Sequence, residues 1–504
     1  MMKIPWYGEL AAKLSRESTI PLSRQIYSEI AQGILSGQLK PGARIPSARQ
    51  LGTDLGVSRN TVNAAYDQLS AEGYIERTVG AGSRVSDAVP AMMPLGNPAH
   101  RATGRKPQMS TRGRYLTEWT RVMNDLEAGA QHIGAPALDC LPIKLWKRLM
   151  THQLERLPPE ELGYGEAAGY LPLRSAIAEH LNRTRGIEAS GKQIIIVSGT
   201  QQALDLLSRV LLDPKDPVLF EEPGYPGARA AFMGGGATLV PTPVDREGMN
   251  LDALPATQLD ARAAYITPAH QFPLGVTMSL PRRLALLEWA DAFNAWIIED
   301  DYDGEYRYAG KPLSALASID QSARVIYVGT FSKVLFPGLR IGFVVMPNEL
   351  AGRFASARGF MDRQSPILEQ ATLAAFMAGG HYERHIRKMR SVYGERRTAL
   401  MRAFRSTGTD FVEIFAPETG MHVLAHLPEA IDEKRAADLF TTHGLPAMPM
   451  ASYFMNAPTT RGLLVSFANV HVDELDAAVR DLIKDLESAA RDQALNADTA
   501  ALHA

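Results

Sequence analysis

The chain has 504 residues, of which 45% are hydrophobic and 21% charged, and its formal net charge at pH 7 is -2. This length suits a small domain joined to a larger one, and a charge so near zero argues against general adhesion to polyanions. Cys140 is the only cysteine, which excludes an internal disulfide framework and suits a reducing cytoplasm. No apolar stretch is long enough to span a bilayer, and the first twenty residues lack a secretory core.

The first predicted elements are two helices separated by a short break. Apolar residues recur at every fourth position from Leu22 to Ile34, which indicates an amphipathic helix. After the break at Pro41-Gly42, Ser47 is followed three residues later by Gln50. This is the pattern of a capping box, and it predicts the start of a second helix, which ends at a tight turn on Gly56.

A third helix and a hairpin follow. Ser58 is placed to cap this helix, whose apolar residues form an inner face of Val62, Ala65, Tyr66 and Leu69. Polar side chains near its N-terminal end face outward, as in a helix that contacts DNA bases: Arg59, Asn60, Thr61 and Asn63. In the hairpin, Gly80 and Gly82 at the tip would allow close approach of the backbone.

The stretch from Pro21 to about Asp87 resembles the winged helix-turn-helix of GntR-type bacterial regulators. The specific matches are Pro46-Ser47-Ala48-Arg49 and Gly56-Val57-Ser58-Arg59-Asn60-Thr61-Val62. The resemblance implies a double-stranded DNA operator as partner, and DNA contacts from Arg49, Ser58, Arg59, Asn60, Thr61, Asn63 and the wing at Gly80. Charge alone does not distinguish it from a small structural domain, because seven basic residues there accompany six acidic ones. We assign the DNA-binding domain to residues 20–87.

Residues 88–116 are expected to form a basic flexible linker. From Ala88 to Tyr115 the sequence contains five basic residues and no acidic one, among Pro, Gly, Ser and Thr. Such a segment could lie against DNA phosphates. A solvated spacer is an equally good interpretation.

Residues 117–490 are expected to form one large α/β domain. Apolar strands alternate with helical stretches such as 281–293, which predicts a mostly parallel sheet covered on both faces. The expected strands are 193–197, 217–220, 237–240, 263–267, 295–300, 324–328 and 340–345. A smaller α+β part begins at about residue 349, with a long helical region to about Ser406. It continues with strands near 411–415, 421–427 and 463–467, and a last helix near 472–488.

The most specific chemical motif follows the strand at 324–328. Gly329-Thr330-Phe331-Ser332-Lys333, followed by Pro337-Gly338-Leu339-Arg340, combines a lysine and an arginine with hydroxyls and glycines. A lysine can form a Schiff base with an aldehyde, and hydroxyls with a planar guanidinium suit a phosphate dianion. The motif therefore predicts a pyridoxal 5'-phosphate site, and it resembles the cofactor-lysine region of fold-type-I aminotransferases, with Lys333 as the Schiff-base lysine. The alternative is a polar loop with an ordinary surface lysine.

Other parts of such a site occur in the expected order. Strand 295–300 ends in Glu299-Asp300-Asp301-Tyr302, and open α/β sheets build their sites at this end of a strand. An ionised carboxylate keeps the pyridine nitrogen protonated. By resemblance this is Asp300, with Tyr302 on the ring hydroxyl. Asp301 is the rival for the nitrogen contact, because the register is open by one residue.

The remaining cofactor contacts come from two turns. Ser198-Gly199-Thr200-Gln201-Gln202-Ala203 leads from a strand into a helix, whose first amides would face an anion. The resemblance assigns the cofactor phosphate to Gly199, Thr200 and Gln201, together with Thr330, Ser332 and Arg340. It also assigns Tyr225, in Pro223-Gly224-Tyr225-Pro226-Gly227, to stacking on the pyridine ring.

Two features depart from the aminotransferase pattern. The segment from Thr267 to Gly275 looks like the Asn-Pro-x-Gly loop but has Phe272 in the Asn position, where His270 could substitute. The strand at 463–467 contains no arginine to hold a substrate carboxylate. Arg229 and Arg461 are therefore candidates, with His270, for binding an effector. His381 and His385 lie four apart on a helix, but no pattern completes a metal site and no metal is expected.

The two halves together resemble the MocR subfamily of GntR regulators. That resemblance implies an N-terminal winged helix-turn-helix, an α/β fold-type-I aminotransferase-like domain with a smaller C-terminal α+β subdomain, and a cytoplasmic homodimer. We expect a regulator that binds pyridoxal 5'-phosphate and senses an amine or amino-acid-like effector, with weak or half-transamination as a residual activity. The alternatives are an active aminotransferase with an accessory DNA-binding domain, a sensor of the cofactor itself, and a large domain that only dimerises.

Overall fold

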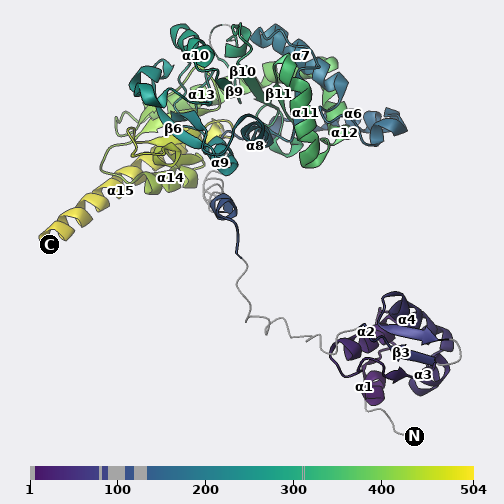
Figure 1. Ribbon diagram of the computed structural model, residues 1–504. Coiled ribbons are helices and arrows are strands. Elements are labelled where there is room, and N and C mark those ends of the chain that lie inside the picture. The colour runs from purple at the N-terminus through teal and green to yellow at the C-terminus, as the bar shows by residue number, and fades with distance from the viewer. Residues whose placement is uncertain are drawn as a thin grey trace. The chain divides into compact units, whose positions relative to one another are not determined.

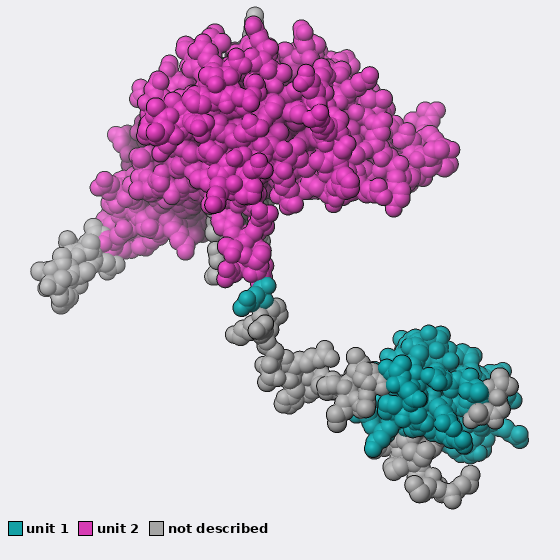
Figure 2. Space-filling model, viewed as in Figure 1, with its two compact units in different colours: residues 1–108 teal, residues 109–504 magenta. Residues whose placement is uncertain are grey.

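The computed structural model describes residues 6–78, 82–88, 108–117, 133–308, 310, 313–470 and 472–503. It consists of two compact units, residues 1–108 and 109–504 (Figure 2). Each unit has its own apolar core. The predicted wing tip at Gly80 and most of the predicted linker lie outside the described residues.

The described part of the N-terminal unit contains four helices and a small antiparallel sheet (Figure 1). The helices are α1 (Trp6–Lys13), α2 (Leu22–Leu35), α3 (Ala48–Leu55) and α4 (Arg59–Ala71). The strands, in the order β1-β3-β2, are β1 (Arg44–Ile45), β2 (Ile75–Thr78) and β3 (Gly82–Val85). The predicted inner faces of α2 and α4 form one buried core, which Leu10 of α1 also joins. The sequence did not predict α1, because charged residues interrupt its apolar pattern.

The two predicted helix starts in this unit are capped. Ser47 Oγ accepts a hydrogen bond from the backbone N–H of Gln50 at 3.2 Å, while the Gln50 side chain donates to Asp54. Only half of the predicted capping box is therefore formed. Gly56 ends α3 in the left-handed conformation, with φ of 64°. The turn between α3 and α4 is thus built as the sequence predicts.

An eight-stranded sheet organises the large unit, in the order β4-β11-β10-β9-β8-β5-β6-β7. Neighbouring strands from β10 through β9, β8 and β5 to β6 are parallel, whereas β11 is antiparallel to both β10 and β4. The strands are β4 (Ile194–Val197), β5 (Pro217–Glu222), β6 (Thr238–Asp245), β7 (Gly248–Met249), β8 (Ala263–Ile266), β9 (Trp296–Asp301), β10 (Val325–Thr330) and β11 (Gly342–Val345). Each predicted strand of this sheet overlaps an observed one, and β7 is additional.

Helices cover both faces of the sheet (Figure 1). In β4, Ile194 and Ile196 belong to one core, and Ile195 and Val197 belong to the other. The first core is covered by α7 (Leu171–Arg185), α12 (Ile367–Ala378) and α13 (His381–Ser406), and α6 (Ile143–Arg156) packs beside α12. The second is covered by α8 (Thr200–Leu211), α9 (Pro226–Gly235) and α11 (Asn348–Asp362), while α10 (Leu280–Ala292) packs on a third cluster. Alternating strand residues thus separate two helical layers.

The C-terminal part carries a second, antiparallel sheet in the order β12-β13-β15-β14. Its strands are β12 (Glu413–Phe415), β13 (His422–His426), β14 (Ala447–Pro449) and β15 (Leu463–Ser466), accompanied by α14 (Glu433–Thr442) and α15 (Leu475–His503). The predicted long helical region is three helices, α11 to α13, and the last helix extends beyond its predicted end. Among the described residues, no helix is both long and apolar enough to cross a bilayer.

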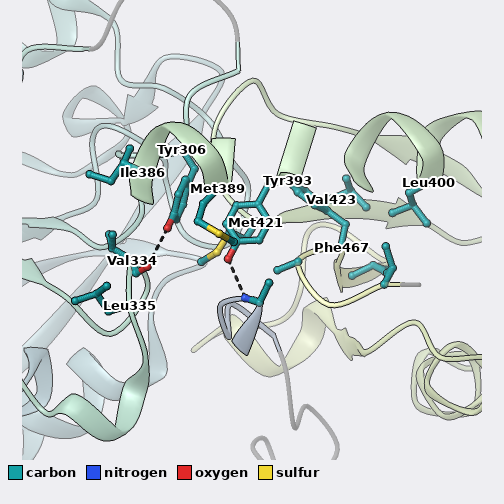
Figure 3. Packing of buried hydrophobic residues seen from close by; sticks show 14 of the residues in the cluster. Tyr306, Val334, Leu335, Ile386, Met389, Tyr393, Leu400, Met421, Val423 and Phe467 are labelled. Atoms are coloured by element: carbon teal, nitrogen blue, oxygen red, sulfur yellow. Dashed lines mark hydrogen bonds between the residues drawn. The ribbon is translucent and has the colours of Figure 1, made fainter. Parts of the chain in front are cut away.

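A buried cluster joins α13 to segments from the rest of the large unit (Figure 3). The Tyr306 and Tyr393 rings meet edge to face, with centroids 4.9 Å apart. Tyr306 donates a hydrogen bond to the carbonyl of Val334, and the backbone N–H of Ala137 donates to the Tyr393 hydroxyl. One core cluster therefore holds both the loop after Lys333 and the segment that begins at residue 133.

Candidate functional site

A cavity of about 880 Å³ lies at the carboxyl ends of β9 and β10 and at the start of α8. Open α/β sheets place their ligand sites at such strand ends. The predicted cofactor residues that line this cavity are Thr200, Gln201, Tyr225, Asp300, Tyr302, Thr330, Ser332, Lys333 and Arg340. Folding therefore brings together residues that span much of the large unit's sequence.

Hydrogen bonds to backbone carbonyls hold the segment that carries Lys333. The Tyr306 hydroxyl donates to the carbonyls of Lys333 and Val334, at 3.3 and 3.4 Å, and His385 Nε2 donates to the Val334 carbonyl at 2.9 Å. Gly134 lies against the lysine amine, because a Cβ added there would be 2.9 Å from Nζ. His385 itself is buried.

Two adjacent aspartates face different surroundings. Asp300 lines the cavity, where its Oδ2 accepts a hydrogen bond from the Tyr265 hydroxyl at 2.8 Å and its buried Oδ1 has no partner. Asp301 Oδ2 instead accepts from Arg185 Nε and the Tyr327 hydroxyl, each at 2.6 Å. Successive strand residues point to opposite faces of a sheet. Burial raises the pKa of the Asp300 carboxyl to about 7.

An anion cradle forms where β4 leads into α8. Gly199 has φ of 91°, and its missing side chain leaves room for Arg340, since a Cβ would be 3.2 Å from the guanidinium. Arg340 donates to the Ser198 carbonyl at 2.6 Å. The first N–H groups of α8, from Thr200, lie beside this guanidinium. Unsatisfied helix N–H groups and a guanidinium together attract a phosphate dianion.

These groups fit a pyridine aldehyde that carries a phosphate. The cavity presents the Lys333 amine for the aldehyde, and the unpartnered Asp300 oxygen suits a protonated ring nitrogen. The cradle at Gly199 and Arg340 suits the phosphate. The Gln201 side chain is committed elsewhere, because its Nε2 donates to the Gly227 carbonyl at 3.0 Å.

Phe272 lies at the centre of a cluster of aromatic rings on the cavity wall. Its ring meets those of Tyr225, Tyr302, His422 and Tyr453 edge to face, with centroids 5.2 to 6.0 Å apart. All five residues line the cavity. The position that holds Asn in the aminotransferase pattern is therefore filled by an apolar ring that packs on four others.

A buried hydrogen-bonded group lies behind Tyr302. His270 Nδ1 is 3.0 Å from both carboxylate oxygens of Asp303 and 2.9 Å from the Tyr302 hydroxyl. The His270 ring stacks on His422 with centroids 4.8 Å apart at 29°, and one ligand atom each of His270, Asp303 and His422 lies within 4.8 Å of the others. Burial lowers the pKa of His422 well below its usual value and raises that of Asp303. His270 lies behind Tyr302 and is not among the residues that line the cavity, so a direct contact with an effector stays a prediction.

The two arginines predicted to bind an effector point to backbone carbonyls instead. Arg229 Nη1 donates to the Phe454 carbonyl, and Arg461 Nη2 donates to the Ile431 carbonyl, each at 3.0 Å. Neither arginine lines the cavity. Their guanidinium groups hydrogen-bond to neighbouring loops, and their contact with an anionic group of the effector stays a prediction.

The predicted DNA-contacting residues lie at the starts of α3 and α4. Arg49, Arg59 and Asn60 are exposed, as base-reading or phosphate-binding side chains must be. Ser58 Oγ instead accepts from the backbone N–H of Thr61 at 3.1 Å and caps α4. Asn63 accepts from Arg77 of β2 at 3.2 Å, which ties α4 to the hairpin. Gly80 lies outside the described residues.

Several cavity residues were missed by sequence reasoning. Gly134, Tyr265, Asp303 and His422 reach the site from four separate segments, and no local motif marks them. Only Asp303 carried a signal, because it lies three residues after Asp300 in a run of carboxylates at a strand end. The others depend on contacts between distant parts of the chain.

Comparisons with known proteins match both units. The family described as aminotransferase class I and II matches residues 138–482, and the bacterial regulatory proteins of the gntR family match residues 22–85. The chain is 37% identical over 469 residues to a probable rhizopine catabolism regulatory protein of Rhizobium meliloti, MocR, covering 93% of this chain and 94% of that protein. It is 33% identical over 361 residues to aromatic-amino-acid aminotransferase 1 of Thermococcus litoralis, covering 70% and 87%. An archaeal alanine:glyoxylate aminotransferase structure superposes with a TM-score of 0.67 at 28% identity, covering 75% and 98%.

Proposed function

The chain belongs to the MocR-type regulators, in which a GntR domain precedes a class I and II aminotransferase domain, and we propose that its large unit senses a small amine through bound pyridoxal 5'-phosphate. Its relatives include the HTH-type transcriptional regulator TauR of Rhodobacter capsulatus and the HTH-type pyridoxine biosynthesis transcriptional regulator PdxR of Corynebacterium glutamicum. The chain is accordingly a DNA-binding transcriptional regulator, and we expect it to act in the cytoplasm. The observation that carries the sensing proposal is the convergence of Lys333, Asp300 and Arg340 on one cavity.

Each of these residues has a distinct task in the proposed site. Arg340, with the N–H groups that begin α8, holds the phosphate, and Asp300 keeps the ring nitrogen protonated. Tyr302, oriented by His270, donates to the ring hydroxyl. When bound, the cofactor supplies an aldehyde carbon that exchanges between primary amines. Lys333 is the resident amine, and Gly134 leaves room for its Nζ.

The response to an effector follows from how Lys333 is tethered. Its loop is bound to α13 through His385. It is bound to the buried cluster through Tyr306, which donates to the Val334 carbonyl (Figure 3). An effector amine bound beside Lys333 would compete with the lysine amine for the aldehyde and would make new contacts with the cavity wall. The effector shifts the large unit between two conformations only by its difference in affinity for them. That shift is transmitted to the DNA-binding unit.

We further propose a homodimer formed through the large unit. Tyr164 and Phe360 are 86% and 94% exposed, and Leu162 and Met361 beside them are also exposed. Large exposed apolar side chains that cluster in this way mark protein contact surfaces. A second copy of the chain is the expected partner, because two winged helices would then be presented to an operator with two half-sites.

The sensing proposal is tested by absorption spectroscopy and DNA binding in parallel. Full-length protein and the variant Lys333→Ala are titrated with pyridoxal 5'-phosphate, then with primary amines, and operator affinity is measured at each stage. We expect a visible band that depends on Lys333, and an amine response of DNA binding that the variant lacks although its basal affinity is retained. An unchanged response in Lys333→Ala would rule out the covalent part of the proposal.

An active aminotransferase is the second candidate. The chain is 33% identical to a named aminotransferase over most of its large unit, and its lysine and carboxylate are both present in the cavity. Phe272 in the Asn position and the absence of a cavity arginine other than Arg340, among the residues described, weigh against efficient turnover. Multiple turnovers with an amino donor and a 2-oxo acid would favour the enzyme, whereas a single half-reaction would favour the regulator.

A further inference from the structure

The cavity wall beside the proposed cofactor site is apolar and aromatic. Ile133, Phe272, Met448 and Tyr453 line the cavity, and all four belong to or pack against one buried cluster. That cluster is completed by Leu424, Met450, Phe454 and Leu464. An effector bound next to Lys333 would contact these apolar side chains.

The second sheet explains why the wall has no charge. Leu464 of β15 pairs with Leu424 of β13 on one side and with Met448 of β14 on the other. The three side chains form one row across the sheet, and Met448 brings that row to the cavity. Leu464 is fully buried. This sheet therefore offers aliphatic contact where a carboxylate would need a cation.

The charged groups of the described cavity lining are mostly negative. Its cations are Lys333 and Arg340, which serve the aldehyde and the phosphate, whereas Asp205, Asp300 and Asp303 are its acidic residues. Arg229 and Arg461 donate to backbone carbonyls away from the lining. Burial keeps His422 uncharged by lowering its pKa.

This wall disfavours the binding of a carboxylate and favours the binding of an amine with an uncharged body. A carboxylate placed against this wall would lose water without gaining a charged partner, which is a large penalty for an ion. An ammonium group is attracted by aromatic faces and by neighbouring carboxylates. An uncharged ligand body gains from burial against Ile133, Phe272 and Met448.

We propose that the effector is a primary amine without a carboxylate, whose uncharged body packs against the wall formed by Phe272, Met448 and Tyr453. This inference rests on the amine-sensing function proposed above and narrows it: α-amino acids are excluded as effectors. The primary amine is required because it must replace the Lys333 amine at the aldehyde. The carbon body, and not a carboxylate, supplies the binding energy.

The test compares ligands that differ only in the carboxylate. Full-length protein loaded with pyridoxal 5'-phosphate is titrated with 2-phenylethylamine and phenylalanine, and with 3-methylbutylamine and leucine, while the absorption band is followed. The same titrations on free pyridoxal 5'-phosphate correct for intrinsic differences between the amines. We expect half-saturation at a concentration at least about tenfold lower for each amine than for its amino acid, after this correction. Equal or tighter binding of the amino acids would overturn the inference.

A charge-gain variant tests the wall directly. Met448→Arg places a guanidinium on the cavity wall, and we expect it to lower the half-saturating concentration of leucine and phenylalanine by about tenfold. Leu284→Arg, on the exposed face of α10, adds the same charge away from the cavity and should leave both series unchanged. If Met448→Arg does not load the cofactor, the comparison in the unaltered protein decides alone.

The outcomes separate this inference from the function on which it rests. If amino acids shift the band and the matched amines do not, sensing stands and the effector class is wrong. If amines shift the band without changing operator affinity, the effector class stands and the regulatory link fails. If neither series shifts a band that depends on Lys333, amine sensing fails and this inference fails with it.

Discussion

Asp300 is a buried carboxyl with one oxygen bonded to Tyr265 and the other without a partner. Ionisation of a carboxyl in this position is unfavourable unless a cation lies beside it. The neighbouring Asp301 is satisfied by Arg185 and Tyr327, so a single residue step along β9 separates a structural ion pair from a group that is available to a ligand. At the scale of single residues, the atom available to a ligand is the Asp300 oxygen that has no hydrogen-bond partner.

The pH dependence of stability should reveal Asp300 in the cofactor-free protein. Burial raises its pKa from 3.8 to about 7, so the folded state binds a proton more tightly than the unfolded state. The stability contributed by the protonated group is therefore lost as pH rises from about 4 to about 7, between the unfolded and folded pKa values, by up to ~1.4 kcal/mol per pH unit. Asp300→Asn does not titrate, so its thermal midpoint relative to the unaltered protein should rise between about pH 4 and about pH 7 and stay constant above that.

The comparison is internally controlled. Glu299, whose pKa burial also raises to about 7, titrates in both proteins and cancels in the difference. A difference in thermal midpoint that does not change with pH would contradict the assignment of Asp300 as an unpaired buried carboxyl.

Gly134 should matter for Lys333 and not only for the backbone. A Cβ at Gly134 would be 2.9 Å from Lys333 Nζ, and the cheapest relief is displacement of the flexible amine. Gly134→Ala is therefore expected to weaken pyridoxal 5'-phosphate binding by about tenfold, or ~1.4 kcal/mol, as measured by equilibrium titration. Gly444→Ala is the matched control, because Gly444 also has positive φ but nothing within 4 Å of its added Cβ. Equal loss in both variants would mean that only backbone strain is being measured.

At the scale of elements, the first turn of α4 has a side-chain cap and the first turn of α8 has none. The first turn of α4 is closed by Ser58, whose oxygen satisfies the N–H of Thr61. The first turn of α8 follows Gly199 and has no side-chain cap, so its N–H groups remain for a ligand. The cap thus stabilises the proposed recognition helix, α4. In α8 the uncapped N–H groups are available to the proposed phosphate.

Removal of the α4 cap should weaken DNA binding through the helix start. Ser58→Ala deletes the bond to Thr61 and is expected to lower stability by ~1 kcal/mol, and operator affinity by about fivefold if the helix start must be ordered. Fluorescence anisotropy with operator DNA measures the affinity. Ser279→Ala removes the corresponding cap of α10 in the large unit and should leave it unchanged. Full operator affinity in Ser58→Ala would show that the cap is dispensable for recognition.

At the scale of the whole molecule, the chain divides into two units with separate cores. The small unit carries the elements expected to contact DNA, and the large unit carries the cavity. Regulation then requires that an effector bound in the cavity of the large unit changes a property that also affects the DNA-binding unit. Assembly into a dimer is the simplest such property, because the large unit exposes the apolar side chains of Tyr164 and Phe360.

A charge at the exposed patch should disrupt assembly. Phe360→Asp places a carboxylate on a side chain that is 94% exposed, and we expect it to raise the dimer dissociation constant by at least about tenfold. Sedimentation velocity over a concentration series measures the change. Leu280→Asp alters a similarly exposed apolar residue on α10 and should sediment as the unaltered protein does. Identical behaviour of the two variants would exclude the patch around Phe360 as the dimer contact.

Local patterns in the sequence were sufficient to predict much of this architecture. Apolar runs of four to six residues predicted the strands of the main sheet, because both faces of that sheet are buried and their side chains must be apolar throughout. Helix starts at Ser47 and Ser58 were predictable because a cap acts on the next three residues. Lys333 and Arg340 were predictable because their loop is continuous in sequence.

The tertiary structure decided what the local patterns left open. It places Asp300 in the cavity and Asp301 in an ion pair, since the register of β9 depends on both neighbouring strands. It turns Arg229 and Arg461 toward backbone carbonyls and surrounds Phe272 with four aromatic rings. The sequence by itself thus determined the elements and the chemistry available, because both depend on residues close along the chain. The character of the cavity wall was decided by the tertiary structure, because Met448, Leu464 and Phe272 meet only when three distant segments pack together.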